Sequence, residues 1–494
     1  MSLQRSTLAP GAGCERLLHR PGCGYLLPCA RRPDTQADMV FSPAPGPDLA
    51  GAIENLARAS VLVVGDAMLD RYVFGSVARI SPEAPVPVLA VSRELAVPGG
   101  AGNVVRNLTA LGAAAALVSV VGDDQAGSDL TGLIGGQPNV EPWLLVQGSR
   151  CTTVKTRFVA DGQQLLRSDQ EVTTPIHDKL AERLLRITGD VLAATSVTVL
   201  SDYAKGVLAG DTPSRIIAAA RDAGRKVVAD PRGTDLDRFA GADVVVVTLR
   251  ALEAATGMAV GADAQMAAAA RWLRAAHGFG AVVVNRRAEG FFLTAHDVEQ
   301  VVPAGAGEMF DFTGAGDTAV AAIAAALAVN HDLLVAVRIA ALAMAVSATQ
   351  PGMAVASAAD LVAVLTPRGR ALRKIVEPAA AAEQMAHWRR GGLRTGLLSV
   401  HPASLAPSGL EALRLYCDRL VLAVEAEPDS PPGLADIAAQ PGVDLICPVL
   451  PGAFLETLAL LRPDVLLNRD VDDDIVALVT GWGATVLAQE IAET

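Results

Sequence analysis

The stretch Asp-Phe-Thr-Gly-Ala-Gly-Asp-Thr, at positions 311–318, is a glycine turn that ends in a carboxylate and leads into an apolar run. Because Gly314 and Gly316 have no Cβ, successive backbone N–H groups in the turn can converge on an anion. Residues 318–330, rich in Ala, Ile, Val and Leu, predict a helix whose positive N-terminal end adds to this anion site. The stretch therefore predicts an anion-binding turn that opens a helix.

Two interpretations of Asp317 follow from this position. A carboxylate within reach of a sugar hydroxyl can accept its proton while the backbone amides of Gly314, Ala315 and Gly316 stabilise a transferring phosphoryl group. The alternative is that Asp317 only caps the helix and the glycines only form a tight turn, which is the commoner meaning of an isolated GxGD pattern. The rest of the chain favours phosphoryl transfer.

Size and composition narrow the class of protein. A chain of 494 residues is expected to form two domains. Its net charge of −12 argues against a nucleic-acid-binding surface. Six scattered cysteines without a CxxC pair predict neither a zinc site nor a disulfide framework, and favour a cytoplasmic location. The uncharged run at 339–359 contains a Pro-Gly turn and predicts a buried helix, not a membrane span.

An α/β fold is predicted by alternation of strand-like and helix-like segments. Short β-branched runs lie at 61–65, 115–121, 197–201, 226–229, 244–247 and 281–284, with helical stretches such as 178–188, 213–223 and 264–276 between them. This order predicts a mainly parallel sheet with helices on both faces and ligands at the carboxyl ends of its strands. Residues 72–97 and 151–168 alternate like strands without helices between them, and predict a small β lid.

Breaks in the pattern suggest the domain boundaries. Residues 1–50 are expected to be a disordered extension, in which the segment up to Met39 reflects either an early start site or a tail. Residues 51–368 are expected to form the first domain and residues 369–393 a linker. A second strand-helix series predicts a smaller α/β domain at 394–494.

A second glycine turn, Pro-Gly-Gly-Ala-Gly-Asn at 98–103, also precedes a predicted helix. Gly99 and Gly100 would lie against sugar hydroxyls, with Asn103 as hydrogen-bond donor and acceptor to them. The alternative is a loop with an asparagine cap. Its occurrence together with the first turn favours a shared binding site.

Charged residues follow three of the predicted strands. Asp66 and Asp70 follow the first strand, Asp202 and Lys205 follow another, and the segment 230–233 follows the next. Since the carboxyl ends of parallel strands meet at one edge of a sheet, these groups are expected to line one polar cleft.

These motifs together resemble the ribokinase-type sugar kinases. The similarity rests on residues 63–66, 98–103 and 311–318 and covers about residues 55–365. Residues 79–88, 201–206 and 230–235 are similar to one branch, the heptose-7-phosphate kinase half of the bifunctional enzymes that make ADP-heptose for lipopolysaccharide. The resemblance implies ATP- and Mg²⁺-dependent phosphorylation of D-glycero-D-manno-heptose 7-phosphate at C1. A kinase for another sugar phosphate, or a non-catalytic binding scaffold, remains the alternative.

The resemblance also implies roles for particular residues. Asp317 would be the base and the 314–316 turn the anion hole. The other implied or charge-based candidates are Asp66, Asp70, Gly99, Gly100, Asn103 and Asp202 for the sugar, Lys155, Arg157 and Lys205 for its phosphate, and Thr313, Gly314, Arg250 and Glu253 for the nucleotide, with Glu253 as an indirect metal contact. Arg250 replaces the asparagine usual in the family, and it cannot accept a hydrogen bond from a metal-bound water.

The second domain resembles the adenylyltransferase half of the bifunctional enzymes but departs from its His-x-Gly-His signature. Gapless counting places Ala-Ser-Leu-Ala, residues 403–406, at the signature, and His401 lies two residues before it. Asn-Arg-Asp at 468–470 replaces the lysine and glycines of a later motif. We therefore expect a degenerate domain without adenylyltransferase activity, retained for homodimer formation or for contact with a separate adenylyltransferase.

Overall fold

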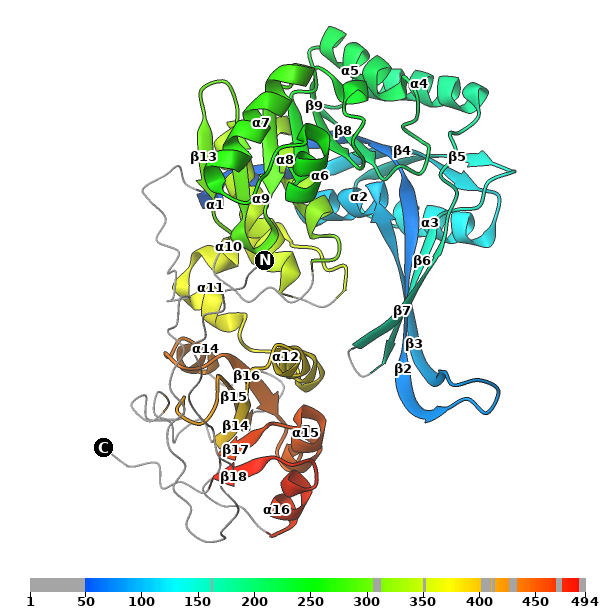
Figure 1. Cartoon of the computed structure of the whole chain (residues 1–494). Coiled ribbons are helices and arrows are strands. Elements are labelled where there is room, and N and C mark those ends of the chain that lie inside the picture. Colours follow the sequence, from blue (N-terminus) through cyan, green and yellow to red (C-terminus); the bar gives the residue numbers. More distant parts are fainter. Residues whose placement is uncertain are drawn as a thin grey trace, which may run out of the picture. The chain divides into compact units, whose positions relative to one another are not determined.

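The computed structural model describes residues 49–160, 163–304, 312–349, 352–400, 410, 414–425, 433–467 and 473–487 (Figure 1). Their strands form sheets of nine, five and four strands. Several sequence features lie outside these residues: the extension up to residue 48, Asp311, His401, the 403–406 segment and the 468–470 segment. Among the described residues, no helix has the length and apolarity needed to cross a bilayer.

The nine-stranded sheet has the order β13-β12-β11-β10-β9-β8-β1-β4-β5. Its strands are β1 (Ser60–Gly65), β4 (Ala114–Gly122), β5 (Val140–Gln147), β8 (Val197–Asp202), β9 (Lys226–Pro231), β10 (Val244–Thr248), β11 (Ala281–Asn285), β12 (Phe291–Thr294) and β13 (Glu299–Val302). All neighbours from β5 to β11 are parallel, whereas β12 and β13 pair antiparallel at one edge. The predicted mainly parallel sheet is confirmed.

Helices cover both faces of this sheet, so the alternate residues of the central strand β1 are buried on opposite sides. Val61 and Val63 pack in one cluster, and Leu62 and Val64 pack in another. The helices are α1 (Leu49–Glu54), α2 (Ala101–Ala110), α3 (Gln125–Gly135), α4 (Asp178–Leu192), α5 (Thr212–Asp222), α6 (Leu249–Thr256), α7 (Asp263–His277), α8 (Ala315–Ala328), α9 (Leu333–Ala348), α10 (Ala358–Leu365) and α11 (Pro367–Leu372), with 3-10 turns η1 (Asn55–Arg58), η2 (Asp237–Phe239) and η3 (Arg287–Glu289).

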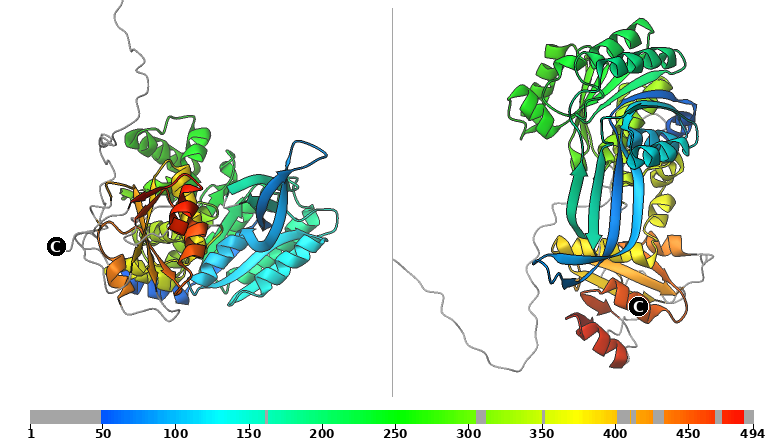
Figure 2. Two further views of the ribbon diagram at one scale, coloured as in Figure 1. Left: turned by 90° about the horizontal axis from the view of Figure 1, so that it is seen from below. Right: turned by 90° about the vertical axis from the view of Figure 1, so that its right-hand side faces the viewer.

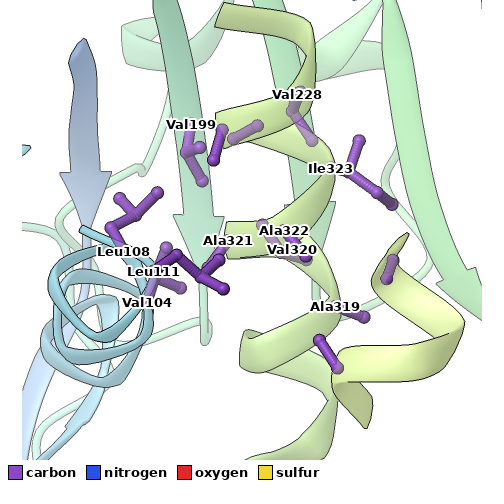
Figure 3. Packing of buried hydrophobic residues seen from close by; sticks show 14 of the residues in the cluster. Val104, Leu108, Leu111, Val199, Val228, Ala319, Val320, Ala321, Ala322 and Ile323 are labelled. Atoms are coloured by element: carbon purple, nitrogen blue, oxygen red, sulfur yellow. The ribbon is translucent and has the colours of Figure 1, made fainter. Parts of the chain in front are cut away.

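Helix α8 is the buried helix that the 311–318 stretch opens. Its alanines let it pack closely beside α2 and against the sheet, where Ala321 and Val320 lie near Leu108 of α2, Leu111 at its C-cap and Val199 of β8 (Figure 3). The N-termini of α2 and α8 each carry a glycine turn. Packing these two helices together therefore places residues about 210 positions apart in one site.

The predicted β lid is present as the four-stranded sheet, in the order β3-β2-β6-β7. Its strands are β2 (Ala67–Ile80), β3 (Pro87–Gly100), β6 (Val154–Ala160) and β7 (Gln163–Gln170). β2 pairs antiparallel with β3 and parallel with β6, and the paired β2 and β3 form the long ribbon seen in Figure 2. Since β2 starts two residues after β1 ends, lid residues begin directly at the carboxyl edge of the large sheet.

The C-terminal sheet is entirely parallel and has the order β16-β15-β14-β17-β18. Its elements are β14 (Thr395–Val400), β15 (Arg419–Glu425), β16 (Leu445–Val449), β17 (Val465–Leu467) and β18 (Thr485–Leu487), with α12 (Pro378–Arg390), α14 (Leu434–Ala438), α15 (Phe454–Leu461) and α16 (Asp473–Thr480). Numbered along the chain, this order is 3-2-1-4-5, a doubly wound arrangement of the Rossmann type.

The predicted linker 369–393 is only partly a connection. Within it, α12 buries Ala381, Met385 and Trp388 in the same cluster as Leu397 and Val421 of the C-terminal sheet. These residues recur at helical spacing, so one face of α12 is apolar and packs on the sheet. The C-terminal core therefore starts at α12, earlier than the boundary at 394.

Candidate active site

The two glycine turns meet through Asn103. Gly314 is the N-cap of α8 and has a φ of +79°, which is the left-handed conformation that glycine adopts readily. Gly100 is the N-cap of α2 and has a φ of +56°. The Asn103 side-chain amide lies 3.4 Å from the Gly314 carbonyl and 2.9 Å from Asp317 Oδ2, and donates to both. Asn103 thus joins the start of α2 to Gly314 and Asp317 of the anion-binding turn.

The Asp317 carboxylate is held by side chains, not by its own helix. It is 2% exposed; Oδ2 accepts the Asn103 amide and Oδ1 accepts the phenol hydroxyl of Tyr203. The capping alternative is contradicted, because Gly314 occupies the N-cap position. An ionised carboxylate has about four acceptor positions, so two remain for an incoming hydroxyl.

Burial raises the pKa of Asp317 to about 6. The positive charge of Arg232 and the hydrogen bonds from Tyr203 and Asn103 oppose this rise, and the Asp230 carboxylate adds to it. A carboxylate with such a pKa is ionised at neutral pH, yet it is a stronger base than an exposed aspartate. Asp317 therefore has the position and the basicity of a general base.

This pKa has a measurable consequence for stability. Because the folded state raises the pKa of Asp317 from 3.8 to about 6, its protonated form stabilises the fold below about pH 4, and this contribution is lost as pH rises through 6. We expect the free energy of unfolding of wild type, relative to Asp317→Asn, to fall by about 3 kcal/mol between pH 3 and pH 7. Chemical denaturation at several pH values measures it. The same measurement with Asp222→Asn, at an exposed position, is the control. If the Asp317→Asn difference changed as little with pH as the Asp222→Asn difference, the prediction would be contradicted.

The structure adds Tyr203 and Arg232, which were not singled out as site residues from the sequence. Arg232 Nη2 lies 3.2 Å from Tyr203 Oη and 3.1 Å from Asp230 Oδ2, and its guanidinium carbon is 4.8 Å from the centre of the Tyr203 ring. Both follow parallel strands, β8 and β9, that end beside each other. Their position at strand ends was the only sequence signal that could have revealed them.

Asp66 is hydrogen-bonded within the protein, and its contact with the sugar stays a prediction. Asp66 is 1% exposed and accepts the backbone N–H groups of Tyr203, Lys205 and Val207 at 2.8, 3.0 and 3.0 Å. Burial raises its pKa to about 6 despite these donors. Asp66 therefore holds the loop at 203–207. Arg150 fastens that loop from another side, donating to the Lys205 carbonyl.

Asp202 is likewise used within the fold. It is 2% exposed, pairs with Arg238 at 3.0 Å and accepts the backbone N–H of Ala204 at 2.8 Å. Its charge is thus compensated by Arg238, and its side chain fixes the turn that follows β8. The role of Asp202 in sugar binding stays a prediction.

Gly99 allows Asp70 to lie close to the backbone. Asp70 is 3% exposed, forms an ion pair with Arg157, and its Oδ2 occupies the space that a Cβ on residue 99 would fill. Arg157 also lies over the Tyr72 ring, 5.2 Å from its centre. Asp70 and Arg157 are thus brought together at the base of the lid, as one ion pair.

The two lysines predicted to bind phosphate also come together. Lys155 and Lys205 both contact Glu171, at 3.2 and 2.9 Å, and Lys155 also contacts Asp169 at 3.0 Å. These four residues form what we call the lysine cluster, which lies between the lid and the loop at 203–207. Two positive charges from separate elements therefore converge on one carboxylate.

The predicted nucleotide residues lie on other elements. Arg250 and Glu253 have exposed side chains on α6, which follows β10, whereas Thr313 and Gly314 belong to the turn before α8. Within the described residues, no three His, Cys, Asp or Glu side chains form a metal-binding group. Glu253 offers an exposed carboxylate, the oxygen ligand that Mg²⁺ prefers.

Comparison with known proteins finds a matching family model and similar proteins. Residues 58–359 match the model of the pfkB family of carbohydrate kinases. A protein of Acidiphilium cryptum named bifunctional protein HldE is 49% identical over 466 residues, covering 90% of this chain and 96% of the relative. The protein of the same name from Paramagnetospirillum magneticum is 42% identical over 467 residues, covering 89% and 95%. Phosphofructokinase-2 from Escherichia coli, solved with substrates and products, aligns with a TM-score of 0.54 at 20% identity, covering 62% of this chain and 99% of that one.

Proposed function

The chain belongs to the pfkB family of carbohydrate kinases, and from this premise we propose that it phosphorylates D-glycero-D-manno-heptose 7-phosphate at C1 with ATP. The product would be the 1,7-bisphosphate, a precursor for ADP-heptose. The observation that carries the proposal is the buried Asp317 carboxylate, held between Asn103 and Tyr203 directly beside a glycine turn at a helix N-terminus.

Residues of both glycine turns would share the chemical step. The C1 hydroxyl gives its proton to Asp317 while its oxygen forms a bond to the γ-phosphorus of ATP. The bond from that phosphorus to the β–γ bridging oxygen breaks, and ADP leaves with the electron pair. The backbone N–H groups of the 314–316 turn would stabilise the transferring group. When bound with ATP, Mg²⁺ supplies neutralising charge on the phosphates, with Glu253 as its candidate outer contact.

The choice of a heptose 7-phosphate rests on the relatives named HldE and on the lysine cluster. Lys155 and Lys205 approach Glu171 from β6 and from the loop after β8. A dianionic phosphate could replace Glu171 as their partner, since charge-assisted contacts to phosphate are strong. The same cluster would suit other sugar phosphates, so a kinase for another member of that class is the second candidate function.

A substrate panel tests this function. Purified protein with ATP and Mg²⁺ is offered heptose 7-phosphate, fructose 6-phosphate, ribose 5-phosphate and unphosphorylated heptose, and ADP release is measured. We expect the highest kcat/KM with heptose 7-phosphate. A higher value with another sugar phosphate would support the second candidate, and ADP release with none of them would favour a binding scaffold.

We further propose that the C-terminal domain has lost adenylyl transfer. Support comes from the sequence at 403–406, where no histidine stands, and at 468–470, where Asn-Arg-Asp replaces the expected lysine and glycines. In doubly wound sheets such as this one, ligands bind at the switch in strand order, here between β14 and β17. Both altered segments directly follow those two strands.

A pyrophosphate assay checks the loss. With heptose 1-phosphate, ATP and Mg²⁺, the protein is expected to release pyrophosphate no faster than a buffer control. Without the two imidazoles, the negative charge that develops on the nucleotide phosphates would lack its stabilising donors. Pyrophosphate release that is retained by Asp317→Ala would show an active second site in the C-terminal domain.

A further inference from the structure

We propose that Arg232, acting through Tyr203, is a positioning residue that holds Asp317 in its reactive orientation and extends positive charge to the phosphoryl-binding turn. The proposal rests on the kinase function above and assigns two residues to it that the sequence motifs left without a role. Its basis is a connected set of contacts at the ends of β8 and β9.

The contacts run in one direction from the arginine to the base. Arg232 Nη2 donates to Tyr203 Oη at 3.2 Å, and the Tyr203 hydroxyl in turn donates its own proton to Asp317 Oδ1. Burial and the nearby Asp317 charge raise the pKa of Tyr203 well above its ordinary value, so the phenol keeps that proton. Asp230 pairs with Arg232 and fixes the guanidinium. Tyr203 is thus a neutral donor with a cation behind it.

A matching chain of contacts reaches the other carboxylate oxygen. Arg106 Nη1 donates to Asn103 Oδ1 at 3.0 Å, and the Asn103 amide donates to Asp317 Oδ2 at 2.9 Å. Each oxygen of the base therefore has a neutral donor that is itself held by an arginine. This arrangement fixes the carboxylate plane while leaving the positive charges one residue away from the base.

The backbone around Tyr203 leaves little freedom for the phenol to move. Asp66 accepts three N–H groups from the loop at 203–207, and Arg150 binds the Lys205 carbonyl. Ala204 adopts a φ of +54°, an unusual conformation for a residue with a Cβ, and the surrounding hydrogen bonds hold it there. Such a fixed loop is suited to orienting a partner side chain.

Arg232 is also close to the turn that would bind the phosphoryl group. A Cβ placed on Gly316 would lie 3.7 Å from Arg232 Nη2, so the guanidinium borders the backbone of the turn. The charged and titratable groups that face Asp317 are Asp230 from β9, Arg232 directly after it, Tyr203 after β8, and Arg106 from α2. Within this set, Arg232 is the cation that borders the turn and is linked to Asp317 through Tyr203.

Removal of the cation should therefore change the pH profile as well as the rate. For Arg232→Met we expect kcat to fall about a hundredfold, the size of effect seen when a preorganised charge or donor is removed. The acid limb of kcat against pH should move to higher pH, because the Arg232 charge lowers the pKa of Asp317. Arg232→Lys should keep the limb near its wild-type position, and Tyr203→Phe should shift it upward with a smaller loss of kcat.

Controls separate this role from a structural one. Arg271→Met removes an arginine that pairs with Glu299 on the surface and should leave kcat and the acid limb unchanged. A double-mutant cycle between Arg232→Met and Asp317→Asn measures their interaction from unfolding free energies and requires no kinase activity. This interaction free energy should grow from pH 4 to pH 8, because Asp317 becomes ionised over that range. Additive effects at every pH, or equal acid limbs for Arg232→Met, Arg232→Lys and wild type, would overturn the proposal. If wild type were inactive but the cycle were non-additive, the kinase function would be refuted and the positioning role of Arg232 would stand.

Discussion

Asp317→Ala is expected to lower kcat for ATP-dependent phosphorylation by at least about a hundredfold, as the loss of a positioned general base does. The buried carboxylate is the only described side chain that lies at the glycine turn and is also held by donors from α2 and from the loop after β8. The sugar KM should change much less, because the substitution removes the proton acceptor and leaves the lysine cluster intact. Initial rates of ADP release against sugar concentration measure both constants.

Asp230→Ala is not a suitable control for this prediction, because Asp230 fixes Arg232. A better control is Asp129→Ala on α3, whose half-buried carboxylate pairs with Arg71 at 3.6 Å and accepts the Gln125 side-chain amide at 2.8 Å. Its kcat should match wild type. If Asp317→Ala kept more than about a tenth of the wild-type kcat, a proton-accepting role for Asp317 would be untenable.

Gly314→Ala is expected to cause a large loss of activity as well. Residue 314 has a φ of +79°, where a Cβ costs about 1–2 kcal/mol, and that Cβ would lie 2.6 Å from the Asn103 side-chain nitrogen. Asn103 would have to leave its position on Asp317, so both the turn and the base would be displaced. We expect kcat to fall about a hundredfold, the loss that a shift of about 1 Å in a reacting group can cause.

Gly278→Ala is the matched control. Gly278 also has a positive φ, of +64°, at the C-cap of α7, but a Cβ there meets nothing within 4 Å. It should lose stability by roughly 1 kcal/mol, as strain alone requires, and keep its kcat. Thermal unfolding and steady-state rates of the two variants separate strain from displacement of the site. Equal kcat values in the two would show that the Asn103 contact is unimportant for catalysis.

Much of this fold was accessible from sequence because its signals are local. The glycine turn at 311–318 and the alanine-rich run after it predicted α8, and the alternation in 72–97 and 151–168 predicted the lid. β5 and the antiparallel edge strands β12 and β13 were missed. β5 contains Pro142 and has exposed residues at most positions of its first half, so it lacks the buried β-branched run of a central strand.

The linker was misjudged for a different reason. The Pro and basic residues at 366–373 and the Arg-Gly break at 389–392 suggested a loop. Between them, however, the apolar residues Ala381, Met385 and Trp388 recur at spacings of four and three. That periodicity was a sufficient signal for an amphipathic helix.

The site was harder to predict than the fold, because its contacts depend on which strands are neighbours. The Asp66 carboxylate accepts hydrogen bonds from N–H groups that lie 137 to 141 residues further along the chain. Only the pairing of β1 with β8 brings these groups close to it. The link from Arg232 to Tyr203 depends in the same way on the β8–β9 pairing. A carboxylate at a strand end could thus be placed at the carboxyl edge of the sheet, but its partners could not.

Phosphorus NMR of a reaction containing the wild-type protein, ATP, Mg²⁺ and D-glycero-D-manno-heptose 7-phosphate tests the proposed function most directly. The predicted result is a new phosphomonoester signal that couples to the anomeric proton of the sugar, appearing together with ADP and absent with Asp317→Ala. Loss of ATP without such a signal, or the same signal at the same rate with Asp317→Ala, would contradict phosphoryl transfer to C1 by this site.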